Sequence, residues 1–124
     1  MLNILVVDDE TAIQILLREI LAAEGHYVKT VPTARHAWNT IRDEEFDVVL
    51  SDISLPDADG IELVRQISME FPNLRVIAMS GFMAAIPPAT LYEAGSAAML
   101  QKPFTARELF SALSSTVRAL AAVS

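Results

Sequence analysis

FDVVLSDISLP, residues 46–56, is the stretch of sequence that decides the fold. Residues 48–50 are apolar without alternation, which is typical of a parallel strand covered by helices on both faces. The run ends at a carboxylate, Asp52, and Pro56 then opens a turn sequence that leads to Gly60. We therefore expect a buried strand that carries Asp52 at its carboxyl end, the edge where ligands and chemistry gather in open α/β sheets.

The composition narrows the class of protein. A chain of 124 residues suits one domain with a sizeable core, and we expect a single domain over residues 1–124 without an output domain. The net charge of −7, with no cluster of basic residues, disfavours nucleic acid and anionic membrane surfaces as partners. With no cysteine, disulfides and thiolate metal sites are excluded. No signal-peptide pattern is found, and a cytoplasmic protein is expected.

Strand-like and helix-like segments alternate along the whole chain. Besides the strand that ends at Asp52, strands are predicted at residues 4–7, 27–31, 74–79 and 97–101. A segment of helical periodicity follows each strand, and Pro87-Pro88 predicts that the fourth helix is short or displaced. Short strands joined by helix-length crossovers imply right-handed βαβ units. The predicted fold is a three-layer α/β/α sandwich around five parallel strands.

Polar residues follow four of these strands, and the carboxyl ends of parallel strands share one edge. They are Asp8, Asp9, Asp52, Ser80 and Lys102. Neighbouring carboxylates repel by about 4 kcal/mol per pair at an effective dielectric of about 20 unless protons or a cation intervene, and a divalent metal is the simplest answer. Oxygen ligands without His or Cys favour a hard ion, and Mg²⁺ better than Ca²⁺. A metal, an ammonium group and a hydroxyl around one carboxylate can hold a phosphoryl group while that carboxylate attacks it.

This set resembles the receiver domain of two-component response regulators. The resemblance rests on Asp8-Asp9, Asp52, Ser80-Gly81 and Lys102-Pro103-Phe104, with residues 57–60 after the central strand, and covers essentially the whole chain. It implies a flavodoxin-like fold with strand order 2-1-3-4-5. It also implies a stand-alone signalling protein, a monomer or weak dimer, that takes a phosphoryl group from a histidine kinase or histidine phosphotransfer protein and acts on a downstream protein.

The resemblance assigns the acidic residues their roles. Asp52 would be the phosphorylated residue and a Mg²⁺ ligand. Asp9 would bind Mg²⁺ directly, and Asp8 would bind it directly or through water. The backbone carbonyl of Ser54 would complete the protein ligands.

It also assigns roles on the other side of the site. Ser80 would be the switch hydroxyl that bonds a phosphoryl oxygen, and Lys102 would pair with another such oxygen. The Lys102–Pro103 peptide bond is expected to be cis. The family usually carries Tyr or Phe three residues before the lysine, where this chain has Met99. We expect Met99 to replace the usual aromatic rotation, because an unbranched side chain can change rotamer and fill the vacated space.

Three other functions are weighed against this one. An interaction module of the same fold that signals without phosphate stays open, because Met99 departs from the usual switch. A phosphatase with an aspartyl nucleophile needs an acid two residues later, where Ser54 stands. A flavodoxin would offer hydroxyls and amides to its flavin phosphate, whereas Asp8-Asp9 repels one. We expect no enzymatic activity beyond promotion of the protein's own aspartyl phosphorylation and dephosphorylation.

Overall fold

The structure is a computed structural model that describes residues 1–82 and 85–123, with side chains as far as Val117. One parallel sheet runs through its centre in the order β2-β1-β3-β4-β5. Its strands are β1 (Asn3–Val7), β2 (Tyr27–Val31), β3 (Val48–Asp52), β4 (Arg75–Ser80) and β5 (Ser96–Gln101). The predicted strand order and the parallel arrangement are confirmed.

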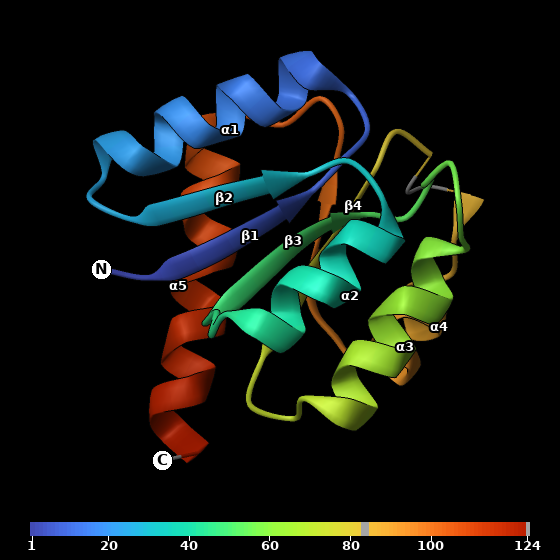
Figure 1. Cartoon of the computed structure of the whole chain (residues 1–124). Helices are drawn as coiled ribbons and strands as arrows, with labels where there is room; N and C mark the ends of the chain where they lie inside the picture. The colour runs from blue at the N-terminus through green and yellow to red at the C-terminus, as the bar shows by residue number, and fades with distance from the viewer. Residues whose placement is uncertain (83–84, 124) are drawn as a thin grey trace.

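Five helices cover the two faces of the sheet (Figure 1). They are α1 (Thr11–Ala23), α2 (Ala34–Asp43), α3 (Gly60–Glu70), α4 (Pro88–Ala94) and α5 (Ala106–Val123). Helices α1 and α5 lie on one face, and α2, α3 and α4 lie on the other. This confirms the three-layer architecture. Within the described residues, no helix is both long enough and apolar enough to cross a bilayer.

The core has two halves, one on each face of the sheet. Successive side chains of a strand point to opposite faces. Ile4 and Val6 of β1 therefore pack with α1 and α5, whereas Leu5 and Val7 pack with α2 and α3. A strand buried on both sides has no polar position to alternate with, which explains the continuous apolar runs in the sequence.

Local signals set where the helices begin and end. Thr105 and Glu108 form a capping box before α5: the Thr105 hydroxyl accepts from the Glu108 amide at 3.1 Å, and the Glu108 carboxylate accepts from the Thr105 amide at 3.2 Å. Helix α4 has only seven residues and begins at Pro88, so the short fourth helix is confirmed. It ends at Gly95, whose φ of 111° is left-handed and suits glycine. Residues 83–84 lie outside the described part of the chain.

Candidate functional site

Buried polar side chains gather at the carboxyl edge of the sheet. Asp8 follows β1 and is fully buried, Asp52 ends β3 and is 4% exposed, and Ser80 ends β4 and is 1% exposed. Lys102 follows β5. The backbone amide of Asp8 still donates to the Val31 carbonyl at 3.1 Å, so the β1–β2 ladder fixes the position of Asp8. Four strands thus bring their terminal polar residues to one edge.

Lys102 joins the acidic residues. Its Nζ lies 2.7 Å from Asp8 Oδ2 and 3.0 Å from Asp52 Oδ2. A third carboxylate, that of Glu10, lies 3.3 Å from the same nitrogen at the solvent side of the site. The lysine side chain is only 13% exposed, so the ion pairs with Asp8 and Asp52 are shielded from water.

The second oxygen of each buried carboxylate is held by a nearby amide. Asp8 Oδ1 accepts from the backbone N–H of Glu10 at 2.9 Å, and Asp52 Oδ1 accepts from that of Ser54 at 2.9 Å. Each acceptor lies two residues before its donor, which is the local bonding that Asp favours at the start of a loop. Both carboxylates are therefore oriented by the backbone as well as by Lys102.

Burial and ion pairing raise the pKa values of two groups in the site, Asp8 and Lys102. Burial raises the pKa of the Asp8 carboxyl, although the hydrogen bond from Lys102 opposes that shift. Burial also disfavours the charged ammonium of Lys102, but the hydrogen bonds to Asp8 and then to Asp52 outweigh it, so its pKa is raised above the ordinary value. Lys102 is consequently charged at any physiological pH.

The donor set fits a hard divalent cation. Asp8, Glu10 and Asp52 each offer a carboxylate oxygen, and these oxygens lie within 4.8 Å of one another. Three carboxylates and one ammonium group leave two negative charges, which Mg²⁺ would balance. Glu10 was missed as a member of this group, although its place after Asp8-Asp9 hinted at it. Asp9, to which the resemblance gives direct metal binding, is exposed and is not part of this group.

Ser80 lies beside this group, and its hydroxyl is turned to its own loop. Ser80 Oγ accepts from the backbone N–H of Phe82 at 2.9 Å. The Ser80 carbonyl accepts from the amide of Lys102 at 2.8 Å, which links the ends of β4 and β5. The Lys102–Pro103 peptide bond is cis. Met99 is half-buried and packs on the cluster formed by Ile53, Ala78 and Leu91.

The loop between β3 and α3 is tightly closed. Ser54 and Asp59 form an antiparallel bridge, and the Gly60 amide donates to the Ile53 carbonyl at 3.1 Å. The backbones approach so closely here that a Cβ added to Gly60 would lie 2.2 Å from Ile53 Cα. Gly60 is thus required by the loop that follows Asp52.

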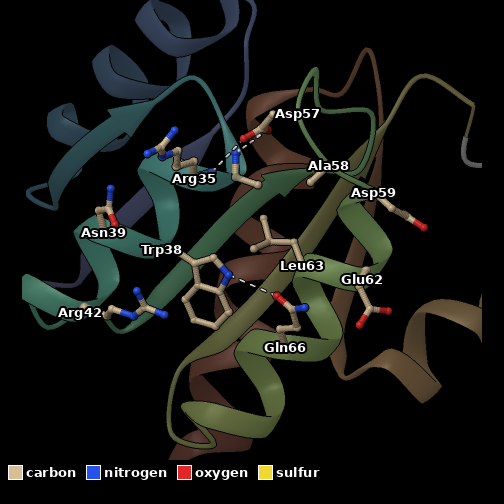
Figure 2. A pocket seen from close by; sticks show the side chains of 11 residues that line it. Arg35, Trp38, Asn39, Arg42, Asp57, Ala58, Asp59, Glu62, Leu63 and Gln66 are labelled. Carbon is tan, nitrogen blue, oxygen red and sulfur yellow. Dashed lines mark hydrogen bonds between the residues drawn. The ribbon is translucent and has the colours of Figure 1, made fainter.

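The same loop is attached to α2 through Asp57 (Figure 2). Asp57 Oδ1 accepts from the amide of Ala34 at 3.0 Å, and its Oδ2 accepts from the amide of Arg35 at 3.1 Å. These bonds, first that from Ala34, lower the pKa of the Asp57 carboxyl. The sequence had indicated only a turn at Asp57. Its reach to a helix more than twenty residues earlier depends on the tertiary structure.

A surface groove of about 460 Å³ lies between α2 and α3. Trp38 crosses it and donates from Nε1 to Gln66 Oε1 at 3.2 Å (Figure 2). None of the residues that contact Lys102 Nζ lines this groove. The groove is therefore separate from the acidic site.

Comparison with known proteins gives one consistent result. A family model of the response regulator receiver domain matches residues 4–114. The DNA-binding transcriptional regulator NtrC of Azospirillum brasilense is 37% identical over 109 residues, which cover 88% of this chain and 23% of that protein. The sporulation initiation phosphotransferase F of Bacillus subtilis (strain 168) is 32% identical over 107 residues, which cover 86% of each protein. The chain thus spans less than a quarter of the NtrC relative and most of the phosphotransferase.

Solved structures share the fold over nearly the full chain. A CheY-like receiver domain protein from Methanospirillum hungatei JF-1 superposes with a TM-score of 0.91 at 30% identity, covering 98% of both chains. The response regulator protein TrrA from Thermotoga maritima, solved in complex with Mg²⁺ and BeF, has a TM-score of 0.85 at 27% identity. That match covers 94% of this chain and 99% of TrrA.

Proposed function

Because this chain belongs to the response regulator receiver domain family, we propose that it accepts a phosphoryl group on Asp52 in a Mg²⁺-dependent reaction. The observation that carries the proposal is the position of Lys102 Nζ, 3.0 Å from Asp52 Oδ2 and 2.7 Å from Asp8 Oδ2. In this arrangement the proposed nucleophile, Asp52, lies beside a fixed positive charge that also contacts Asp8, the proposed metal ligand. Those are the elements that phosphoryl transfer to a carboxylate needs.

The donor in this proposal is the phosphohistidine of a histidine kinase or a histidine phosphotransfer protein. An Asp52 oxygen attacks the phosphorus, the new P–O bond forms, and the P–N bond breaks. The imidazole nitrogen leaves with the electron pair and takes up a proton from solvent. The product is a mixed anhydride on Asp52, and it carries the signal to a downstream protein.

The surrounding residues orient and neutralise the transferred group. Lys102, kept charged by its neighbours, lies close enough to Asp52 to pair with an oxygen of a phosphoryl group bound there. Ser80 Oγ accepts from the Phe82 amide and donates to no group among the described residues, so its O–H proton can be directed at a phosphoryl oxygen when the hydroxyl turns. Asp8 and Asp52 would hold Mg²⁺, with Glu10 in reach. When bound, Mg²⁺ would supply positive charge that offsets the charge on the phosphoryl oxygens.

The resemblance adds two ligands to this metal site, and we carry both as proposals. They are the carboxylate of Asp9, which is exposed close to the group, and the backbone carbonyl of Ser54. Ser54 is well placed in one respect, since its amide already bonds Asp52 Oδ1 at 2.9 Å.

The proposal is tested by incubating the protein with Mg²⁺ and acetyl phosphate and measuring its intact mass. We expect one added phosphoryl group that disappears in Asp52→Asn and is sensitive to hydroxylamine, as an acyl phosphate is. Asp43→Asn is the matched control, because Asp43 is an exposed acid at the end of α2, away from the site. No added mass in the native protein under these conditions would remove the proposal.

A second candidate is a receiver-fold adaptor that signals without phosphate. Met99 favours it, because a half-buried methionine occupies the position of the aromatic ring expected in this family. Binding to a partner that is unchanged by acetyl phosphate and by Asp52→Asn would support the adaptor and contradict the switch.

We further propose that the protein acts in the cytoplasm as a stand-alone receiver, monomeric or weakly dimeric, without nucleic-acid or membrane partners. The similarity to the Bacillus subtilis phosphotransferase over 86% of that protein supports the stand-alone form. The net charge of −7 supports the absence of polyanionic partners. Immunoblotting of the native cells for the mass of the endogenous protein tests the stand-alone form directly.

A further inference from the structure

The side chain of Gln101 connects the two loops that carry Ser80 and Lys102. Gln101 Nε2 donates to the carbonyl of Gly81 at 3.0 Å and to the carbonyl of Lys102 at 2.8 Å. The strand register places Gln101 opposite Ser80. One amide group therefore joins the loop after β4 to the loop after β5.

This side-chain hydrogen bond follows directly after the last backbone hydrogen bond between the ends of β4 and β5. The amide of Lys102 donates to the Ser80 carbonyl at 2.8 Å, and the Gln101 side chain then reaches the next carbonyl, that of Gly81. Gly81 is exposed, and a Cβ added to it would meet no atom within 4 Å. Packing leaves Gly81 free on that side, and the hydrogen bond from Gln101 holds its carbonyl directly.

The held loop carries the hydroxyl that the proposed function assigns to a phosphoryl oxygen. Ser80 Oγ is engaged with the amide of Phe82 at 2.9 Å, so the hydroxyl belongs to the turn that Gly81 forms. In the proposed switch the hydroxyl turns toward Asp52, which breaks its bond to the Phe82 amide and displaces the Gly81 carbonyl of the same peptide group. The hydrogen bond from Gln101 opposes that shift.

We propose that Gln101 is a positioning residue that holds the Ser80–Gly81 loop with the Ser80 hydroxyl on the Phe82 amide, and so sets how readily Ser80 engages the phosphoryl group. The inference rests on the proposed function of Asp52 and concerns the regulation of that same site. Loss of the two N–H donors of Gln101 shifts the loop toward the conformation that binds phosphate. The bond to the Lys102 carbonyl adds to the effect by fixing the amide in place.

The test compares beryllofluoride binding, in the presence of Mg²⁺, in the wild type and in two variants. Gln101→Met keeps the length of the side chain and removes its donors, so we expect it to bind beryllofluoride about twofold to tenfold more tightly, the effect of one net hydrogen bond. Gln101→Arg keeps N–H donors at similar reach, and we expect an affinity close to that of the wild type. Gln101 is exposed, so thermal unfolding should show that both variants fold normally.

A spectroscopic measurement separates positioning from a merely structural role. In Gln101→Met without ligand, the backbone amide resonance of Phe82 should move toward its position in the beryllofluoride-bound wild type. Gln101→Arg should leave that resonance where the unliganded wild type has it.

Three outcomes would overturn the inference. The first is a beryllofluoride affinity of Gln101→Met that is unchanged or weaker than that of the wild type. The second is an increase in affinity in Gln101→Arg as large as that in Gln101→Met. The third is a Phe82 amide resonance that does not move in Gln101→Met. A wild type that binds no beryllofluoride and accepts no phosphoryl group overturns the proposed function of Asp52 itself. If the wild type binds beryllofluoride and Gln101→Met binds it with the same affinity, only the role of Gln101 is overturned.

Discussion

The side chain of Lys102 carries much of the electrostatic balance of the site. Its ammonium group contacts Asp8, Glu10 and Asp52, and the first and last of these are buried. Burial alone raises the free energy of each charged carboxylate, so the pairing offsets a desolvation cost. Removing the lysine leaves buried negative charges without a counter-charge unless a cation replaces it.

We predict that Lys102→Met lowers the free energy of unfolding by roughly 2–3 kcal/mol without Mg²⁺. This is less than the ~3–5 kcal/mol lost when a fully buried pair is broken, because the lysine side chain is 13% exposed and the site opens to water at the exposed Glu10. Added Mg²⁺ should stabilise Lys102→Met more than the wild type, because the variant site has one more uncompensated negative charge. Urea unfolding with Mg²⁺ and with EDTA measures both effects.

The matched control is Lys29→Met, which breaks the exposed ion pair of Lys29 with Glu44. An exposed pair contributes little to stability, and this one is distant from the metal ligands. Equal destabilisation of the two variants, or an equal response to Mg²⁺, would contradict the balance of charge described for Lys102.

A second prediction concerns Gly60. Gly60→Ala places a methyl group 2.2 Å from Ile53 Cα, and the atoms it meets are all Ile53 backbone, which cannot move aside cheaply. We expect a loss of about 1–3 kcal/mol in unfolding free energy, the usual cost of overpacking. Gly81→Ala is the control, because no atom lies within 4 Å of the added methyl. A neutral Gly60→Ala in urea unfolding would show that the loop after Asp52 has room to relax.

At the scale of elements, the β3–α3 loop contacts α2, and the hydrophobic periodicity of the sequence does not predict this contact. Asp57 bonds the first two amides of α2, where four N–H groups lack partners within the helix and where the helix dipole favours a negative charge. Thr33, the N-cap of α2, accepts from the amide of His36. The first turn of α2 is thus capped both by its own sequence and by a distant loop.

This contact predicts a pH dependence. The pKa of Asp57 is lowered from its ordinary value of 3.8 in the folded protein, so its contribution to stability is present above that value and is lost as pH falls through the lower, folded value. Asp57→Asn should therefore destabilise the protein at pH 7, by about 0.5–2 kcal/mol as for other helix caps, and by less at pH 3. Urea unfolding of both proteins at the two pH values measures the difference.

Glu45→Gln is the control for this comparison. Glu45 is exposed and makes no hydrogen bond to the described part of the chain. Its substitution should change stability little at either pH. A difference between wild type and Asp57→Asn that stays constant from pH 7 to pH 3 would show that the charge of Asp57 is not what stabilises α2.

Other elements show which local signals are reliable. The capping box of α5 and the left-handed Gly95 after α4 form as their residue types predict.

Strand β5 begins one residue earlier than predicted, at Ser96, where the pairing with β4 shifts register between Val76 and Ile77. The buried Ser96 hydroxyl donates to the Ala98 carbonyl at 2.6 Å beside this irregularity. A bulge of this kind depends on both strands and is not visible in either one alone.

At the scale of the whole molecule, the site and the α2–α3 groove lie in different places. The site is at the carboxyl edge of the sheet, and Trp38 lies in the groove, bonded to Gln66 and stacked beneath the Arg42 guanidinium at 5.3 Å from its ring centroid. The ring also packs against Phe71, with centroids 5.9 Å apart. These contacts make Trp38 a reporter of α2 and α3 packing.

We predict that Mg²⁺ stabilises the protein while changing Trp38 fluorescence little. A ligand that binds only the folded state raises stability by RT ln(1 + [L]/Kd), about 2.7 kcal/mol at a hundredfold excess over Kd. A thermal shift series with Mg²⁺, reversed by EDTA and weakened in Asp52→Asn, measures binding, and emission spectra from the same samples measure the environment of Trp38. A large quench would place the metal, or a change it causes, in the α2–α3 layer.

The candidate site was predictable in part because its residues follow strands. Asp8, Asp52, Ser80 and Lys102 each stand at a strand end, and parallel strands bring those ends together whatever the loops do. Lys102 meets Asp8 and Asp52 as that argument requires. The roles of these residues in phosphoryl transfer stay predictions.

The amino-acid sequence by itself determined the alternation of strands and helices, the parallel sheet and the edge at which the polar residues meet, because hydrophobic periodicity and strand-end chemistry are local properties. Only the tertiary structure decided that Glu10 joins Lys102 while Asp9 stays exposed, that Asp57 caps α2, and that Gln101 holds Gly81. Those contacts depend on the direction in which each loop leaves its strand. That direction is set by the packing of distant elements and leaves no repeating pattern in the sequence.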